Sequence, residues 1–286
     1  MYTARIMNRA GEILTLTDRE TEFQVESIRG LSPVPAQVNL TPMAGLDGAQ
    51  FNSSKIQTRN IVVMLRIKGE VEKNRLLLYR FFRTKERHRF FFTNESRSVY
   101  TDGYVETCEV DLFEFGQRLQ ISIICPNPFF QSDDEQSTDI TNVVPLFEFP
   151  FAINYGAPVP ISNNIGSGAS VVTNTSEVET GALFVIRFHE SVAAVRIENT
   201  LTAESMVLRY PFRDGDKVTV DTHRGRKSVT LLRNGIERNL FSSIDVSSVF
   251  LQLDTGPNYF TYYADGEQYA SGVDVTVVYT PEYRGV

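Results

Sequence analysis

The catalytic chemistry open to this sequence is limited first by its histidines, of which there are three: His88, His189 and His223. None of them belongs to an H-E-x-x-H motif, and no cysteine or second histidine stands at metal-ligand spacing. No G-x-S-x-G motif is present to expose a nucleophilic serine. A Ser-His-Asp arrangement does not depend on sequence order and stays open as a geometry. The residues nevertheless favour a protein that is not an enzyme and has no catalytic residue, cofactor or metal.

Two acidic clusters raise the question of calcium binding. Asp214 and Asp216 flank a glycine, and residues 133–135 read Asp-Asp-Glu. Calcium takes roughly six to eight oxygen ligands, usually from a longer loop with a defined rhythm. Neither segment supplies them, so we interpret the first as a hairpin turn and the second as a solvated linker.

A carbohydrate site is the third chemical possibility. Sugars stack on aromatic rings, most often Trp, and this chain has no Trp. Tyr259 and Tyr262 could take that role, although tyrosines so close together in a strand more often pack against neighbouring strands. We keep these two residues as candidate sugar-stacking positions for the alternative that the chain is a carbohydrate-binding module for host cell-wall polysaccharide.

Composition predicts a globular protein with a partner other than nucleic acid. The chain has 286 residues, is 42% hydrophobic, and has a net charge of -7 with an isoelectric point near 5.2. This length favours two domains, and the acidity argues against a nucleic-acid binder. Residues 73–89 are rich in Lys and Arg, which fits either a nucleic-acid-binding helix or a solvated helix flank; we favour the flank.

No run of apolar residues approaches the length of a membrane span, and the N-terminus lacks the pattern of a signal peptide. We therefore expect no membrane association and synthesis in the cytoplasm. Cys108 and Cys125 lie in apolar, strand-like runs. In a reducing compartment they are expected to be buried, unpaired thiols on neighbouring strands.

The elements that would position these residues are almost all strands. Short runs rich in Val, Ile, Thr, Phe and Tyr, broken by Gly, Asn, Asp and Pro, predict an all-β fold. One segment differs: between residues 70 and 87 there is no Gly or Pro, and Leu77, Leu78, Phe81 and Phe82 repeat at helical spacing. We predict a single amphipathic helix near 70–87 that packs on a sheet.

Two domains are predicted, at residues 1–135 and 146–286, joined by a polar connector. Residues 126–145 contain prolines, an acidic run and several Ser, Thr and Asn residues. After this connector, eight short strand-like runs follow at intervals of about 8 to 15 residues, as in a β-sandwich.

Residues 98–130 carry a pattern with a known counterpart. Gly103–Glu106, the Phe-rich turn at Phe113–Phe115, Gln117–Cys125 and the Cys-Pro-Asn-Pro-Phe ending at Phe129 resemble the end of the N-terminal domain of distal tail proteins of non-contractile, long-tailed phages. Upstream, 45–69 is similar to that family's G-x-D-G loop and long strand. The segments 215–229, 253–264 and 273–286 resemble its C-terminal domain, although Phe129 stands where the family often has Trp or Tyr.

The resemblance implies a ring-forming N-terminal β-sandwich domain with one helix, followed by a C-terminal galectin-like β-sandwich. Such proteins form a homo-hexameric ring at the virion tail tip, which joins the tail tube protein to the tail-associated hub protein and can carry receptor-binding proteins. DNA passes through the lumen without specific binding, which suits an acidic chain, since six copies carry 6 × (-7) = -42. A tail-like bacteriocin shares this architecture.

The loop 41–54 is the candidate assembly interface. Leu46 and Phe51 stand beside Asp47, and apolar residues in a polar loop have little reason to be exposed unless a partner covers them. The extended run 56–67 that follows is expected to leave an unprotected strand edge in a monomer. Two alternatives stay open: the loop packs on its own domain, or the chain is a wall hydrolase. The absence of a paired-carboxylate motif argues against a hydrolase.

Overall fold

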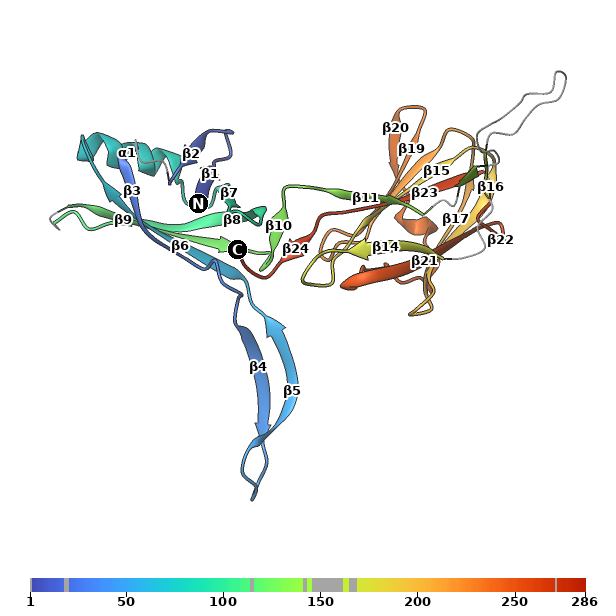
Figure 1. Ribbon diagram of the computed structural model, residues 1–286, viewed down its shortest axis with the longest axis horizontal. Helices are drawn as coiled ribbons and strands as arrows, with labels where there is room; N and C mark the ends of the chain where they lie inside the picture. Colours follow the sequence, from blue (N-terminus) through green and yellow to red (C-terminus); the bar gives the residue numbers. More distant parts are fainter. Residues whose placement is uncertain are drawn as a thin grey trace. The chain divides into compact units, whose positions relative to one another are not determined.

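The computed structural model describes residues 2–17, 21–113, 116–140, 143–145, 162–164, 169–270 and 272–286. These residues form two compact units (Figure 1). Unit 1 comprises Met1–Asp133 and Glu282–Val286, and unit 2 comprises Asp134–Pro281. The chain therefore passes between the units twice. The expected start of the second domain, residue 146, lies outside the described residues.

Unit 1 is one nine-stranded antiparallel sheet with a helix and a hairpin. Along the main path its order is β2-β1-β7-β8-β9-β6-β3, and β10 joins β8 and β24. The strands are β1 (Thr3–Met7), β2 (Ile13–Thr15), β3 (Phe23–Arg29), β6 (Arg59–Ile67), β7 (Arg87–Thr93), β8 (Ser98–Val110), β9 (Arg118–Cys125), β10 (Phe130–Ser132) and β24 (Glu282–Tyr283).

The core of unit 1 follows from alternation along its central strands. In β6 every second residue from Ile61 to Ile67 is buried, and these side chains share one cluster with Ile6 of β1 and Phe23 of β3. Strands near the two ends of the sheet thus contribute to the same core. The expectation of an unprotected edge on β6 is wrong, because this strand is paired on both sides, by β9 and by β3.

The single helix, α1 (Val71–Phe81), is shorter than the predicted 70–87. It ends where Phe81 and Phe82 turn into the core, and Lys85 then takes a left-handed φ of 69° that a helix cannot contain. Residues from Arg87 onward form β7 instead. The predicted apolar stripe is right for three of its four members, since Leu77 is largely exposed.

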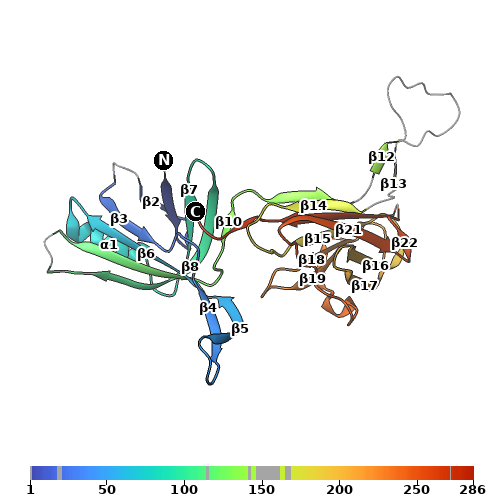
Figure 2. The same cartoon turned by 60° about the horizontal axis from the view of Figure 1, so that its bottom comes forward.

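A long two-stranded hairpin projects from unit 1, and we call it the arm. It consists of β4 (Ala36–Pro42) and β5 (Ala49–Ile56), which pair only with each other and extend from the ends of β3 and β6 away from the sheet (Figures 1 and 2). The segment 41–54, expected to be a loop, is thus the outer part of a hairpin, because the residues on either side of its turn pair in register from Ala36↔Ile56 to Pro42↔Ala49.

The base of the arm is held by Arg59, whose side chain is buried. Its guanidinium donates to the carbonyl oxygens of Gly30, Ser32, Pro128 and Arg284. Gly30 has a φ of 87°, and a Cβ there would lie 2.0 Å from the carbonyl oxygen of Asn60, so only glycine fits. Arg59 therefore joins the start of the arm, the segment leading to unit 2 and the returning C-terminal residues.

Unit 2 is built from two antiparallel sheets around one core. Phe184 and Phe260, on different sheets, meet edge to face at 5.7 Å within this core, so the two sheets pack as a β-sandwich. An all-β fold with one helix, as predicted, is confirmed among the described residues.

The six-stranded sheet of unit 2 has the order β11-β23-β15-β18-β19-β20, and the five-stranded sheet has the order β14-β21-β16-β17 with β22 beside β21. The first contains β11 (Gln136–Asp139), β15 (Leu183–Phe188), β18 (Lys217–Asp221), β19 (Ser228–Arg233), β20 (Ile236–Asn239) and β23 (Val273–Tyr279). The second contains β14 (Ser170–Asn174), β16 (Val192–Asn199), β17 (Glu204–Phe212), β21 (Gly256–Ala264) and β22 (Glu267–Gln268). Unit 2 also contains a short 3-10 helix, η1 (Phe241–Ser243), and a separate strand pair, β12 (Val143–Pro145) and β13 (Ser162–Asn164).

The predicted connector contributes strands as well as a link. Within it, β10 pairs with β8 and β24 in unit 1, and β11 pairs with β23 in unit 2. The last five residues belong to unit 1 because β24 returns to pair with β10.

Candidate assembly surfaces

The three residues predicted for assembly lie on the outer part of the arm. Leu46 and Asp47 are in its turn, and Phe51 is in β5. The side chain of Leu46 is 67% exposed and that of Phe51 is 60% exposed, and Asp47 is also exposed. The alternative that this segment packs on its own unit is wrong, because every residue of β4 and β5 is exposed.

The arm has two chemically different faces. Directly opposed residues of an antiparallel pair share a face, and the register places Leu40 opposite Phe51 and Ala36 opposite Ile56. Val38 lies on the same face as Leu40, two residues away. This face is therefore apolar, and all of its large side chains are exposed.

The opposite face of the arm is a ladder of polar side chains that bond to each other. Asn39 donates to Ser53 at 2.9 Å, and Gln57 at the base donates to Gln37 at 2.9 Å. Asn52, the extra residue at the bulge in β5, donates to Thr41 at 2.6 Å. Several side chains of the polar face bond within the arm, and water can solvate the others. Nothing in the described part of unit 1 covers the apolar face, so the apolar face is the one that suits a partner.

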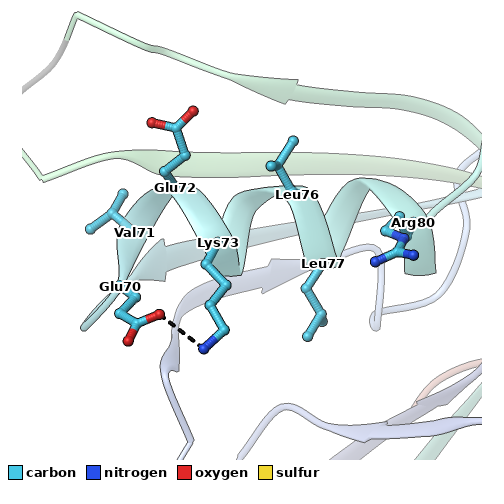
Figure 3. Close-up of a pocket in the computed structure, with 7 residues that line it drawn as sticks. All are labelled: Glu70, Val71, Glu72, Lys73, Leu76, Leu77 and Arg80. Atoms are coloured by element: carbon cyan, nitrogen blue, oxygen red, sulfur yellow. Dashed lines mark ion pairs between the residues drawn. The ribbon is translucent and has the colours of Figure 1, made fainter.

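A second exposed apolar surface lies on α1, and we call it the α1 groove. It is an open depression of about 720 Å³. Its lining residues are Glu70, Val71, Glu72, Lys73, Leu76, Leu77 and Arg80. Leu76 and Leu77, which are 51% and 46% exposed, project from two sides of the helix (Figure 3).

Three of the four charged residues that line the groove are in local ion pairs. Lys73 pairs with Glu70 at 2.9 Å, and Glu72 pairs with Arg75 at 3.2 Å. Arg80, in the last turn, has no ion-pair partner among the described residues. The groove therefore combines two exposed leucines with one uncompensated positive charge.

Sequence reasoning missed this surface, although a signal for it was present. Residues 76–79 read Leu-Leu-Leu-Tyr, and four consecutive large apolar residues cover more of a helix's circumference than one buried face can hold. Leu78 alone of these four is buried.

The two candidate sugar-stacking tyrosines are not presented together to solvent. Tyr262 is fully buried at 0% exposure, and its hydroxyl donates to the carbonyl of Val273 at 2.9 Å. Its ring meets Tyr269 edge to face. The assignment of Tyr262 as a stacking residue is wrong, since this side chain belongs to the core of the sandwich. Tyr259 is half-buried, and Tyr262 cannot provide a second ring beside it for sugar stacking.

The histidines have local structural partners. The ring nitrogens of buried His88 lie 2.8 Å from the carbonyl oxygen of Phe81 and 3.2 Å from that of Glu86, so this residue joins the end of α1 to β7. His189 bonds to Asp274 at 2.7 Å, and His223 bonds to Asp221 at 2.6 Å. In the described part of the chain no group of three potential ligands could hold a metal ion.

Asp214 and Asp216 lie at a turn, but it is not the hairpin turn interpreted from the sequence, because β17 before it and β18 after it belong to different sheets. Asp216 is buried, and it accepts from Arg233 Nε at 2.7 Å and from the backbone N–H of Arg213 at 2.9 Å. The hydrogen bond from Arg233 holds the pKa of Asp216 below its usual value, against the opposing effect of burial. This carboxylate is therefore occupied by a structural ion pair.

Both cysteines are free, and they lie on the neighbouring strands β8 and β9, as predicted. Cys108 pairs in register with Ile121 and Cys125 with Arg59, so the two are not opposite each other. Cys125 is buried but Cys108 only half-buried. Burial raises the pKa of each thiol to about 11.

No described helix has the length and apolar character needed to cross a membrane.

Solved structures of phage proteins share this architecture. The whole chain has the fold of the SPP1 Dit protein, described as a paradigm of the hub adsorption apparatus of phages that infect Gram-positive bacteria, with a TM-score of 0.70, 17% identity and 99% of both chains covered. Two structures of the phage P2 baseplate in its activated conformation, with Ca and with Sr, each match at a TM-score of 0.51 and 13% identity. The first covers 97% of this chain and 98% of that chain, and the second covers 98% of each.

No curated protein sequence matches the chain. Residues 175–283, which include most of unit 2, match the family described as siphovirus-type tail component, C-terminal domain. Over residues 175–283 the chain is thus similar to siphovirus-type tail components, and over its whole length it has the fold of the SPP1 Dit protein.

Proposed function

We propose that this protein is a structural distal tail protein whose unit 1 assembles into a homo-hexameric ring at the tail tip. The observation that carries the proposal is the arm, whose apolar face is exposed along its whole length. A two-stranded hairpin on its own is at best marginally stable in water, so an arm of this kind suits a protein that acts in an assembly. Leu46, Asp47 and Phe51 are its proposed contact residues.

The sheet of unit 1 supports the same proposal. Its edge strands along the main path are β2 and β3. Unpaired strand edges invite association, and a cyclic assembly covers such surfaces by giving each subunit a neighbour on both sides. Unit 2, the β-sandwich, is then outside the ring-forming part and is dispensable for ring formation.

The ring would join the tail tube protein above to the tail-associated hub protein below, and could carry receptor-binding proteins at its periphery. The SPP1 Dit protein is a paradigm of a hub adsorption apparatus, and the shared fold motivates the same role here. Synthesis in the host cytoplasm, before incorporation at the tail tip, is part of this proposal.

The net charge of -7 per chain suits a ring through which DNA moves. Basic walls would bind phosphates and release counterions, which would hold the DNA in place. An acidic lumen repels the DNA backbone and a neutral one does not attract it, so passage occurs without specific binding.

The alternative of a carbohydrate-binding module loses its main support in this structure. The pair Tyr259 and Tyr262 cannot form a stacking platform while Tyr262 is buried in the core. No other observation on the described part of unit 2 favours that function over a structural role.

The test is the assembly state of the purified, full-length protein. Size-exclusion chromatography with light scattering, at several concentrations, should give a hexamer or a multiple of it, and negative-stain class averages should show six-fold rings. A protein that stays monomeric at high concentration, even with the hub partner added, or a ring whose symmetry is not six-fold or a divisor of it, would overturn the proposal.

A further inference from the structure

Resting on the proposed ring, we infer that the apolar face of the arm of one copy docks in the α1 groove of the next copy, with Asp47 facing Arg80. The occupant of the groove is thus a second copy of this chain. In this contact the α1 groove is the surface that receives the arm of the neighbouring copy in the ring.

The arm needs an apolar surface outside its own molecule. Val38, Leu40, Phe51 and Ile56 lie on one face and are all exposed. They are therefore not seated on the sheet or on α1 of their own unit. Each would contribute free energy only on burial by a partner, in proportion to the apolar area removed from water.

The α1 groove offers exposed apolar side chains, as the arm does. Leu76 and Leu77 are exposed on two sides of a helix whose remaining face, with Leu78 and Phe81, is already used in the core. Together the arm and these two leucines hold eight of the exposed large hydrophobic residues of unit 1. A contact between them would cover both surfaces at once.

The arm and the α1 groove also carry complementary charges. Asp47 is the single acidic residue of the segment 36–56, and it has no ion-pair partner in the described part of the chain. Arg80 is the one basic residue of the groove lining without a partner among the described residues, since Lys73 pairs with Glu70. The other charged residue of the arm, Lys55, lies opposite Gln37 on the polar face. The arm thus offers exposed apolar side chains and the acidic Asp47, whereas the groove offers two exposed leucines and the basic Arg80.

The arm and the α1 groove are different surfaces of the same unit, which allows a head-to-tail contact between copies. In a head-to-tail contact each pair keeps one free arm and one free groove, so further copies add until the ring closes. A reciprocal exchange of arms between two copies would instead stop at a dimer, which light scattering distinguishes from a ring.

The experiment is a charge exchange in the full-length protein. We expect Asp47→Arg and Arg80→Glu each to raise the concentration needed for half-assembly by at least about tenfold, because each places like charges together in the contact. The double variant, in which every copy carries both changes, should assemble close to the wild-type concentration. Arg238→Glu, on exposed β20 of unit 2, makes the same charge change as Arg80→Glu and should leave assembly unaltered.

A cysteine pair gives an independent readout. Leu46→Cys with Leu77→Cys in one chain should yield, on mild oxidation, a ladder of covalent oligomers up to six, whereas either change alone should not. The native thiols give little background, because burial raises their pKa to about 11.

The outcomes separate this inference from the proposed function. If wild-type protein forms rings and Arg80→Glu forms them at an unchanged concentration, with no covalent ladder, the α1 groove is not the receiving surface and the ring proposal stands. Loss of hub binding alone in Arg80→Glu would likewise overturn the inference, since the groove would then face the hub. If the wild-type protein forms no ring under any condition, both are overturned.

Discussion

The guanidinium of Arg59 donates a hydrogen bond to the backbone carbonyl of Arg284 at 2.7 Å, across 225 positions of sequence. The same group holds Gly30 and Ser32 at the base of the arm and Pro128 before the crossing to unit 2. Its charged plane also lies 4.1 Å from the ring centre of Phe130. Burial lowers the pKa of Arg59 to about 10, which leaves it protonated at neutral pH.

Arg59→Ala should reduce the free energy of unfolding of unit 1 by about 3 kcal/mol or more, because buried carbonyls lose their donors and a cavity is left. Arg59→Lys, with fewer donors and no planar fork, should lose less. Chemical denaturation followed by circular dichroism measures both. The exposed Arg29→Ala is the matched control and should stay within about 0.5 kcal/mol of wild type. An Arg59→Ala protein as stable as this control would contradict the role assigned to Arg59.

Limited proteolysis should cut in the segment 131–145, which is polar and joins the two units, and should leave two β-rich fragments on a denaturing gel. Because β24 returns to pair with β10, we expect the nicked fragments to stay together in native size-exclusion chromatography. In Arg59→Ala, where the C-terminal residues are held less tightly, they should separate. A resistant core without cleavage between residues 126 and 160 would count against the two-domain organisation.

The ion pair of Asp216 and Arg233 should make unit 2 sensitive to acid. The hydrogen bond from Arg233 lowers the pKa of Asp216 in the folded protein relative to the unfolded chain. The pair therefore stabilises the fold fully above the unfolded pKa, near 4, and this contribution is lost as the pH falls from there through the folded pKa. Asp216→Asn should cost roughly 3 kcal/mol at pH 7 and should flatten this part of the pH dependence. Thermal unfolding between pH 2 and 7 tests it; an unchanged profile in Asp216→Asn would refute it.

The thiols of Cys108 and Cys125 should react very slowly with Ellman's reagent at pH 8 in the folded protein, since a pKa of about 11 leaves little thiolate. Two thiols should react at once after unfolding without reductant. Cys108, which is half-buried, should react before Cys125 under native conditions. Failure of both thiols to react in the unfolded, unreduced protein would mean that they form a disulfide.

Tyr262→Phe should remove the hydroxyl's bond to Val273 and lower the stability of unit 2 by about 1 kcal/mol. Tyr262→Ala should cost about 3–5 kcal/mol because it empties a fully buried site. Neither loss would be a loss of sugar recognition. A glycan array probed with stable Tyr262→Phe and with Tyr259→Ala decides the matter: saturable binding by wild type that Tyr259→Ala abolishes would restore the carbohydrate alternative.

The sequence by itself determined the local structure of this protein. Alternating apolar residues predicted the strands, as in β6, because a strand with one face in the core must alternate. A segment free of Gly and Pro with helical spacing predicted α1. The ordered motifs between Gly103 and Phe129, with those of the C-terminal half, indicated the tail protein family.

The tertiary structure decided which apolar residues are buried, and this depends on contacts between segments far apart in the chain. Neither the burial of Tyr262 nor the exposure of Leu77 could be predicted from the neighbouring residues. Tyr262 lies in a strand-like run and Leu77 in a run with helical spacing, and each run is compatible with a buried or an exposed side chain. The extension of 41–54 into an arm needed the pairing of β4 with β5, and the return of β24 to unit 1 needed β10 and Arg59. Side-chain periodicity reports the face of an element on which a residue lies, whereas burial also requires knowing what packs against that face.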